Sequence, residues 1–274
     1  MPATASSYRL LLATFVAAIF LSAALLFAVQ PLFAKMVLPK LGGTPAVWSV
    51  AMVFFQAMLL AGYAYAHALT HFLPGRSSVI VHLGVMIIAI FALPLGIAVG
   101  WGRAPGQLQE FWLLGLFGAS IGLPFFALSA NGPLLQAWFA RTGHPQAKDP
   151  YFLYAASNIG SFLALLAYPF AVEPFSHLPQ QTFGWTLGFY FLIALIACCG
   201  VWLLRSPNIL PDISADDGAP PTSRDALVWI ALAAVPSALL IAITAHISTD
   251  VAAAPFMWVV PLALYLATFV IAFQ

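Results

Sequence analysis

The chain has 274 residues, of which 63% are hydrophobic and only 6% are charged. A soluble domain carries about 25% charged residues, so the composition excludes a soluble fold and indicates an integral membrane protein. The net charge is +1 and no basic patch is present, which gives no reason to expect a nucleic-acid partner. The two cysteines, Cys198 and Cys199, are adjacent within an apolar run and fit neither a disulfide framework nor a redox motif.

Long apolar runs predict an all-α, polytopic bundle of about eight transmembrane helices, because about 20 apolar residues cross a bilayer core. The expected spans are residues 10–29, 45–71, 78–99, 107–141, 151–172, 181–204, 223–247 and 255–273. The first run is longer than the apolar region of a secretory signal, which has about 7–15 residues, so we expect it to be an uncleaved span.

Proline and glycine mark the expected breaks. Gln30 before Pro31 indicates either a kink with a freed carbonyl inside the bundle or a polar residue at the membrane interface. The third span is expected to kink at Pro94. The fourth apolar run would be on the order of 50 Å long, so Pro124 and the segment 131–133 are its expected break points. Two interpretations stay open: a helix broken inside the membrane, as in transporters, or a span that ends near residue 130 before a short surface helix.

The span 151–172 carries a polar stripe. It follows Asp149-Pro150, a capping acid with proline at the first helical position. Three-four spacing places its tyrosines, asparagine and one serine on one face, and such groups avoid hydrocarbon. We expect this face to line a substrate path, with polar residues of other spans as partners. The substrate-path candidates are Tyr154, Asn158, Ser161, Gln30, Gln56 and Asn131.

Another face of the same span is made of small residues. Ala156, Gly160 and Ala164 recur every four residues, a spacing that lets a neighbouring helix backbone approach closely in lipid. We therefore expect this face to be a helix-packing face and the span to lie at the centre of the bundle.

The sequence has few clusters of residues that could bind a metal or catalyse a reaction. His67 and His71 are four residues apart, and His82 follows on the next span, a spacing that metal or haem ligands use. With no cysteine or carboxylate nearby, histidines at the interfacial end of a helix are the favoured interpretation. No catalytic constellation is visible, so no catalytic residue, cofactor or metal is assigned, and enzymatic activity stays undecided.

Three parts of the chain are expected: a first membrane bundle of about six helices (1–205), a cytoplasmic linker (206–223) and two further transmembrane helices (224–274). The first two spans resemble the last two in short motifs, as expected for a truncated two-half repeat. Six basic residues lie on the side of the N-terminus and three on the other, which predicts that both termini are cytoplasmic.

Residues 20–67, 149–175 and 248–273 resemble the membrane part of bacterial fused proteins, and DPYFLYAASNIGS at 149–161 is the most specific match. In that family a helical bundle similar to the major facilitator superfamily precedes a spermidine-synthase-like domain. The resemblance covers nearly the whole chain, but none of the soluble domain is present, so its enzymatic residues have no counterparts here. Whether the natural chain continues past Gln274 is an open question.

The resemblance implies a location in the inner membrane and two alternative functions. The first is transport, or a substrate channel, for polyamines or related small solutes. The alternative is a non-transporting membrane anchor or scaffold for a cytoplasmic aminopropyltransferase-like domain. The expected partners are the lipid bilayer, a small cationic solute such as a polyamine, and a fused or associated spermidine-synthase-like domain. No acidic residue lies well inside any expected span, which counts against a cation carrier.

Overall fold

A computed structural model describes residues 5–41, 45–101, 108–206, 222–247, 250 and 259–272, and these contain helices and no strand. The helices are α1 (Ala5–Leu41), α2 (Pro45–Phe72), α3 (Gly75–Ala89), α4 (Gln109–Phe117), α5 (Leu123–Ala140), α6 (Tyr151–Ala167), α7 (Glu173–Phe175), α8 (Leu178–Arg205), α9 (Ser223–His246) and α10 (Val259–Ala272). One 3₁₀ turn, η1 (Ile90–Ala92), and two π-helical segments, η2 (Gly118–Gly122) and η3 (Tyr168–Val172), complete them.

Within the described residues, seven helical stretches are long and apolar enough to cross a membrane. The expected eighth span is α10, of which 14 residues are described, while residues 255–258 lie outside the described part. The prediction of an all-helical, multi-span membrane protein is therefore confirmed. The expected linker falls almost entirely on residues that are not described.

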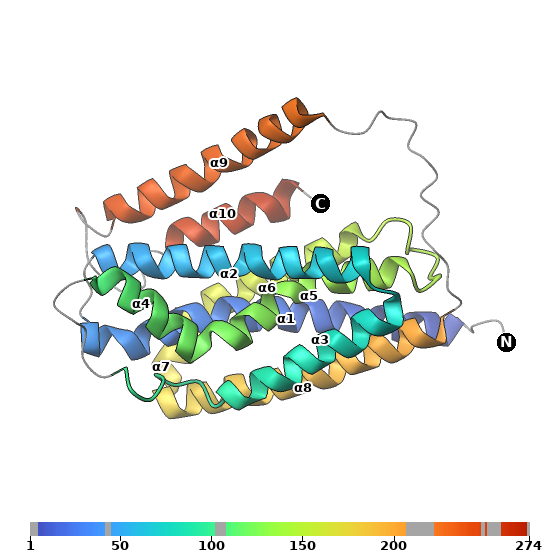
Figure 1. Cartoon of the computed structure of the whole chain (residues 1–274), viewed down its shortest axis with the longest axis horizontal. Helices are drawn as coiled ribbons and strands as arrows, with labels where there is room; N and C mark the ends of the chain where they lie inside the picture. The colour runs from blue at the N-terminus through green and yellow to red at the C-terminus, as the bar shows by residue number, and fades with distance from the viewer. Residues whose placement is uncertain are drawn as a thin grey trace.

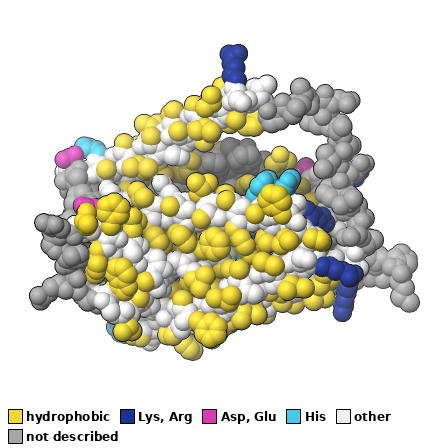
Figure 2. Space-filling view, viewed as in Figure 1, with side chains coloured by type: hydrophobic (Ala, Val, Ile, Leu, Met, Phe, Trp, Pro, Cys, Tyr) yellow, Lys and Arg dark blue, Asp and Glu magenta, His cyan; other side chains and the backbone are white. Residues whose placement is uncertain are grey.

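The long helices lie roughly side by side, and the chain reverses direction from one to the next (Figure 1). On the face shown in Figure 2, hydrophobic side chains cover the middle of the molecule and charged ones lie at its margins. Many large apolar side chains are exposed on the outer faces of the helices. This inverts the pattern of a soluble protein and suits contact with lipid tails.

Among the seven membrane-length stretches, the continuous one from α4 through η2 to α5 is the most buried. In its most apolar 18-residue segment 56% of the residues are buried, against 22% in the stretch Tyr151–Phe175. Aromatic side chains explain the difference: Phe125, Trp138 and Phe139 are fully buried, whereas Tyr154 at the start of α6 is 48% exposed. The expectation that span 151–172 is central is therefore wrong. α6 packs against α1 and α10, at the side of the core.

Of the two predicted break points in the fourth span, the segment 131–133 stays helical, whereas an irregularity does lie just before Pro124. α5 continues through Asn131, Gly132 and Pro133 to Ala140, and the irregularity lies earlier, where η2 precedes Pro124. Proline removes one backbone donor, and a π-helical turn is a local adjustment that lets a helix continue past such a site. The third span does not kink at Pro94 and continue to residue 99: its helix ends at Ala92, and the amide of Ala98 donates to the hydroxyl of Ser120.

Side-chain contacts tie each end of the bundle together. At one end the ring of Tyr8 packs edge-on against His144, with ring centroids 5.3 Å apart, and Arg141 donates to the carbonyl of Thr70. Burial lowers the pKa of the His144 imidazole, which favours its neutral form in this loop. At the other end Lys35 forms an ion pair with Glu173 at 2.7 Å. The segments that the charge pattern places on the same side of the membrane therefore lie at the same end of the helical bundle.

Candidate functional site

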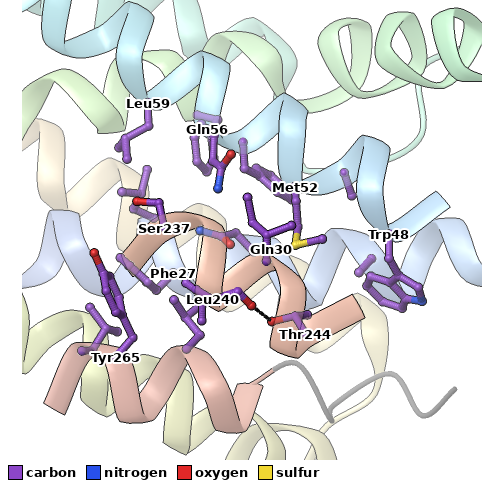
Figure 3. Close-up of a pocket in the computed structure, with 18 residues that line it drawn as sticks. Phe27, Gln30, Trp48, Met52, Gln56, Leu59, Ser237, Leu240, Thr244 and Tyr265 are labelled. Atoms are coloured by element: carbon purple, nitrogen blue, oxygen red, sulfur yellow. Dashed lines mark hydrogen bonds between the residues drawn. The ribbon is translucent and has the colours of Figure 1, made fainter. Parts of the chain in front are cut away.

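A cavity of about 430 Å³ lies between α1, α2 and α5 on one side and α9 and α10 on the other (Figure 3). Its wall is largely apolar, with Phe27, Phe55 and Leu59 among the lining residues. A volume of this size falls within the range of small-molecule sites, which measure roughly 300–1,000 Å³.

Two of the sequence-predicted residues meet in this cavity. Gln30 from α1 and Gln56 from α2 both line it, although they are 26 positions apart in the chain. Within the described part of the chain neither side-chain amide has a hydrogen-bond partner. Each amide offers donors and an acceptor to a solute, and an unpaired amide in an apolar wall gains from such a partner.

The last two described helices supply polar groups that the sequence reasoning did not select. Ser237 and Thr244 lie on α9 and Tyr265 lies on α10 (Figure 3). Ser237 and Thr244 donate to backbone carbonyls one turn earlier on α9, and a hydroxyl oxygen that donates can also accept. Ser237 and Thr244 are seven residues apart in an apolar span, which places them on one face of a helix, and this spacing is the signal by which the sequence could have indicated them.

The electrostatics of the cavity are neutral. None of its lining residues is Lys, Arg, Asp, Glu or His, so the described wall supplies amides, hydroxyls and the rings of Trp48 and Tyr265. Aromatic faces attract cations modestly, by about 0.5–2 kcal/mol, whereas a buried polycation also needs carboxylates. The arrangement therefore suits a mainly apolar solute with neutral hydrogen-bonding groups.

Asn131 lies outside the cavity, in a buried polar network that joins α1, α3 and α5. Its Oδ1 is 2.7 Å from Nε2 of His82 on α3, and its Nδ2 donates to Ser22 on α1. Ser22 in turn lies 3.4 Å from the carbonyl of Leu128, and Trp138 donates to Ser78 nearby. Asn131 is thus fully engaged with other side chains, and in this arrangement it does not line the cavity.

The three stripe residues of α6 do not act together. Ser161 is buried and donates to the carbonyl of Ser157, one turn earlier on its own helix. The Nδ2 of Asn158 is buried without a hydrogen-bond partner, and Tyr154 is half exposed. None of the three lines the cavity. On the opposite side, Gly160 lies against the backbone of α1 at Phe20.

The histidines separate into two kinds. His67 and His71 are exposed on α2 and stack with ring centroids 5.6 Å apart, and no third metal-binding side chain joins them among the described residues. His82 is fully buried in the middle of α3. The interfacial interpretation is therefore wrong for His82, because Asn131 and the packing of α2 and α5 enclose it.

The fold and the neutral cavity define the class: a multi-span helical membrane protein with an internal, mainly apolar site. Comparison with protein-family models, with curated proteins and with solved structures finds no match for this chain. The family resemblance described above thus stays an expectation.

Proposed function

We propose that the chain is a membrane module that binds a small amphipathic solute in the cavity between α1–α2 and α9–α10 and passes it across or along the membrane. The observation that carries the proposal is the meeting of two unpartnered amides, those of Gln30 and Gln56, in an apolar cavity of about 430 Å³. Both amides line the cavity, with Gln30 half-buried and Gln56 exposed, and a solute is a partner that this cavity has room for.

The proposal also includes the more specific expectations that come from the sequence. These are an architecture like that of the major facilitator superfamily, a place in the inner membrane with cytoplasmic termini, and a spermidine-synthase-like partner domain. A polyamine is the narrower candidate solute, favoured by the resemblance and by the rings of Trp48 and Tyr265. The absence of a carboxylate in the described wall favours a neutral solute instead.

Photolabelling of the full chain in lipid nanodiscs tests this function. The probe is a photoreactive diazirine analogue of octanol, whose chain and hydroxyl match the apolar wall and its amides. We expect saturable labelling of cavity residues such as Gln56 and Tyr265, with competition by unlabelled octanol. The double change Gln30→Leu and Gln56→Leu should reduce this labelling, whereas Gln146→Leu, in an exposed loop, should not.

Competition with spermidine distinguishes the two solute classes. Displacement of the probe by spermidine would favour the polyamine candidate, and displacement by octanol alone would favour a neutral solute. Labelling that never saturates, and that falls equally on lipid-facing residues such as Leu163, would contradict a solute site. The scaffold function would then be the better account.

A further inference from the structure

One long side of the cavity is not closed by helix packing. On the opposite side α1 packs against α6, α6 against α10 and α10 against α9, so a continuous wall of packed helices encloses the cavity there. Within the described residues, α9 does not pack on α2 as closely as it packs on α10. Figure 2 shows that the surface is hollowed between α9 and α2. The cavity therefore has a lateral opening along α2.

The residues along this edge of α2 show where the opening lies. Gln56 lines the cavity and is exposed. Leu59 also lines the cavity, whereas the next residue, Leu60, does not line it and is 71% exposed on the outer surface. On α9, Ile241 lines the cavity and is 37% exposed. The wall of the cavity thus meets the outer surface of the molecule at Gln56 and Leu60.

The opening faces the hydrocarbon of the membrane. Gln56 and Leu60 lie in the middle of the membrane-length stretch Val47–Phe72. At this level the outer faces of α2 and α9 carry large apolar side chains that are at least half exposed, namely Val53, Leu60, Leu239 and Ile243. Apolar side chains that are exposed at this depth suit contact with lipid tails. A molecule that enters through the opening therefore comes from the bilayer.

We infer that the cavity is a binding site for a neutral single-chain lipid, of the monoacylglycerol type, which enters sideways from the bilayer. The inference rests on the proposed function and names its solute. The hydroxyl groups of such a head group can donate to and accept from the side-chain amides of Gln30 and Gln56. No residue in the described lining is charged, so a phosphate or an ammonium group would be buried there without a counter-charge.

The lateral opening also determines which chain lengths fit. A closed cavity of about 430 Å³ would have to hold the whole ligand, whereas a laterally open one holds only the head group and the first part of the chain. The rest of the chain stays among the lipid tails, beside α9. Every residue of α9 from Ser223 to Val235 is exposed, so the helix offers a long apolar surface to such a chain.

Competition against the photoreactive octanol probe, with the unmodified full chain in nanodiscs, tests the inference. Monooctanoylglycerol and monooctadecanoylglycerol are compared at equal mole fractions in the nanodisc lipid. We expect their potencies to agree within about threefold, because the outer half of the longer chain never leaves the bilayer. Octadecanoyl-lysophosphatidylcholine carries the same chain on a charged head group and should be at least about tenfold weaker.

A substitution at the rim provides a second measurement. Leu60→Trp places a larger side chain at the opening, so displacement by monooctadecanoylglycerol should weaken about tenfold relative to displacement by monooctanoylglycerol. Val201→Trp is the matched control, because Val201 is 43% exposed on the outer face of α8, away from the cavity. This control should leave the ratio of the two potencies unchanged.

The outcomes separate this inference from the proposed function. If octanol labels the cavity saturably and only the short acylglycerol displaces it, the cavity binds a solute but the lateral lipid site is overturned. Displacement by the lysophosphatidylcholine that matches the acylglycerol would overturn the neutral class of ligand. Equal ratios for Leu60→Trp and Val201→Trp would show that the chain does not pass along α2. Octanol labelling that never saturates would contradict the proposed function itself.

Discussion

Gly160 of α6 lies against the backbone of α1. A Cβ atom added at Gly160 would lie 2.5 Å from the carbonyl oxygen of Phe20 and 3.2 Å from its carbonyl carbon. Backbone atoms cannot turn aside as a side chain can. We therefore expect Gly160→Leu to lower the folded yield sharply, since overpacking of this kind costs roughly 1–3 kcal/mol.

Leu163 is the matched control on the same helix, because it is 49% exposed and points away from the core. Leu163→Phe should give a yield close to that of wild type. Size-exclusion chromatography of both variants in detergent measures the difference. Equal yields for the two variants would mean that the close approach of α6 to α1 does not occur.

Asn131 and Asn158 form a natural pair for a second prediction. Asn131 has a partner at each end of its amide, while Nδ2 of Asn158 is buried and unpaired. Removing one member of a buried network leaves the others unsatisfied at about 1–3 kcal/mol each, whereas removing an unpaired group does not. Asn131→Leu should therefore lower the thermal midpoint, and Asn158→Leu should leave it unchanged or raise it. A larger loss for Asn158→Leu would contradict this assignment.

At the scale of the elements, α9 is the most exposed of the membrane-length helices that the structure describes. No residue is buried in its most apolar 18-residue segment, and Thr244, near the end of the helix, is its one buried residue. α10 is held better, since Ala263 and Leu266 pack on Leu165 of α6. No described residue of α9 or α10 belongs to the main core, to which α1, α2, α3, α4, α5, α6 and α8 contribute.

Truncation tests this division of the molecule. A chain that ends at Arg205 should fold in detergent with a cooperative thermal transition close to that of the full chain, because the main core stays intact. The same truncation should abolish saturable probe binding, since Ser237 and Tyr265 are lost from the cavity. Aggregation of the shortened chain would show that α9 and α10 are required for the fold.

The helices were predictable from the sequence because an uninterrupted apolar run of bilayer length has few alternatives in lipid. The exact irregularities were not. Pro133 sits inside a regular helix, while Pro124 is preceded by the π-helical segment η2. Whether a helix breaks depends on the neighbours that satisfy its freed carbonyls, and those neighbours come from distant parts of the chain.

The candidate site shows the same limit. Gln30 and Gln56 were selected as polar residues in apolar spans, and they do meet in the cavity. The grouping of Asn131 with them fails because its partners, His82 and Ser22, are set by how α1, α3 and α5 pack. The spacing of residues along the sequence identifies those that share one face of a helix. It does not identify which other helix packs against that face.

At the scale of the whole molecule, the contacts at the two ends agree with a single transmembrane arrangement. Tyr8, Thr70 and the 141–149 loop meet at one end, and Lys35 and Glu173 meet at the other. The charge pattern predicts that the first end is cytoplasmic. Between the two ends the cavity is the feature that distinguishes this molecule from a plain helical anchor.

Cysteine accessibility at the cavity tests the central claim most directly. In a chain with Cys198→Ser and Cys199→Ala, single changes Gln30→Cys and Gln56→Cys are compared with Leu163→Cys on the lipid-facing side of α6. The reagent is a small water-soluble methanethiosulfonate, which reacts with the thiolate, a species that requires water. The account predicts rapid modification at 30 and 56, slowed by saturating octanol, and little at 163. Equal lack of reaction at all three positions would contradict it.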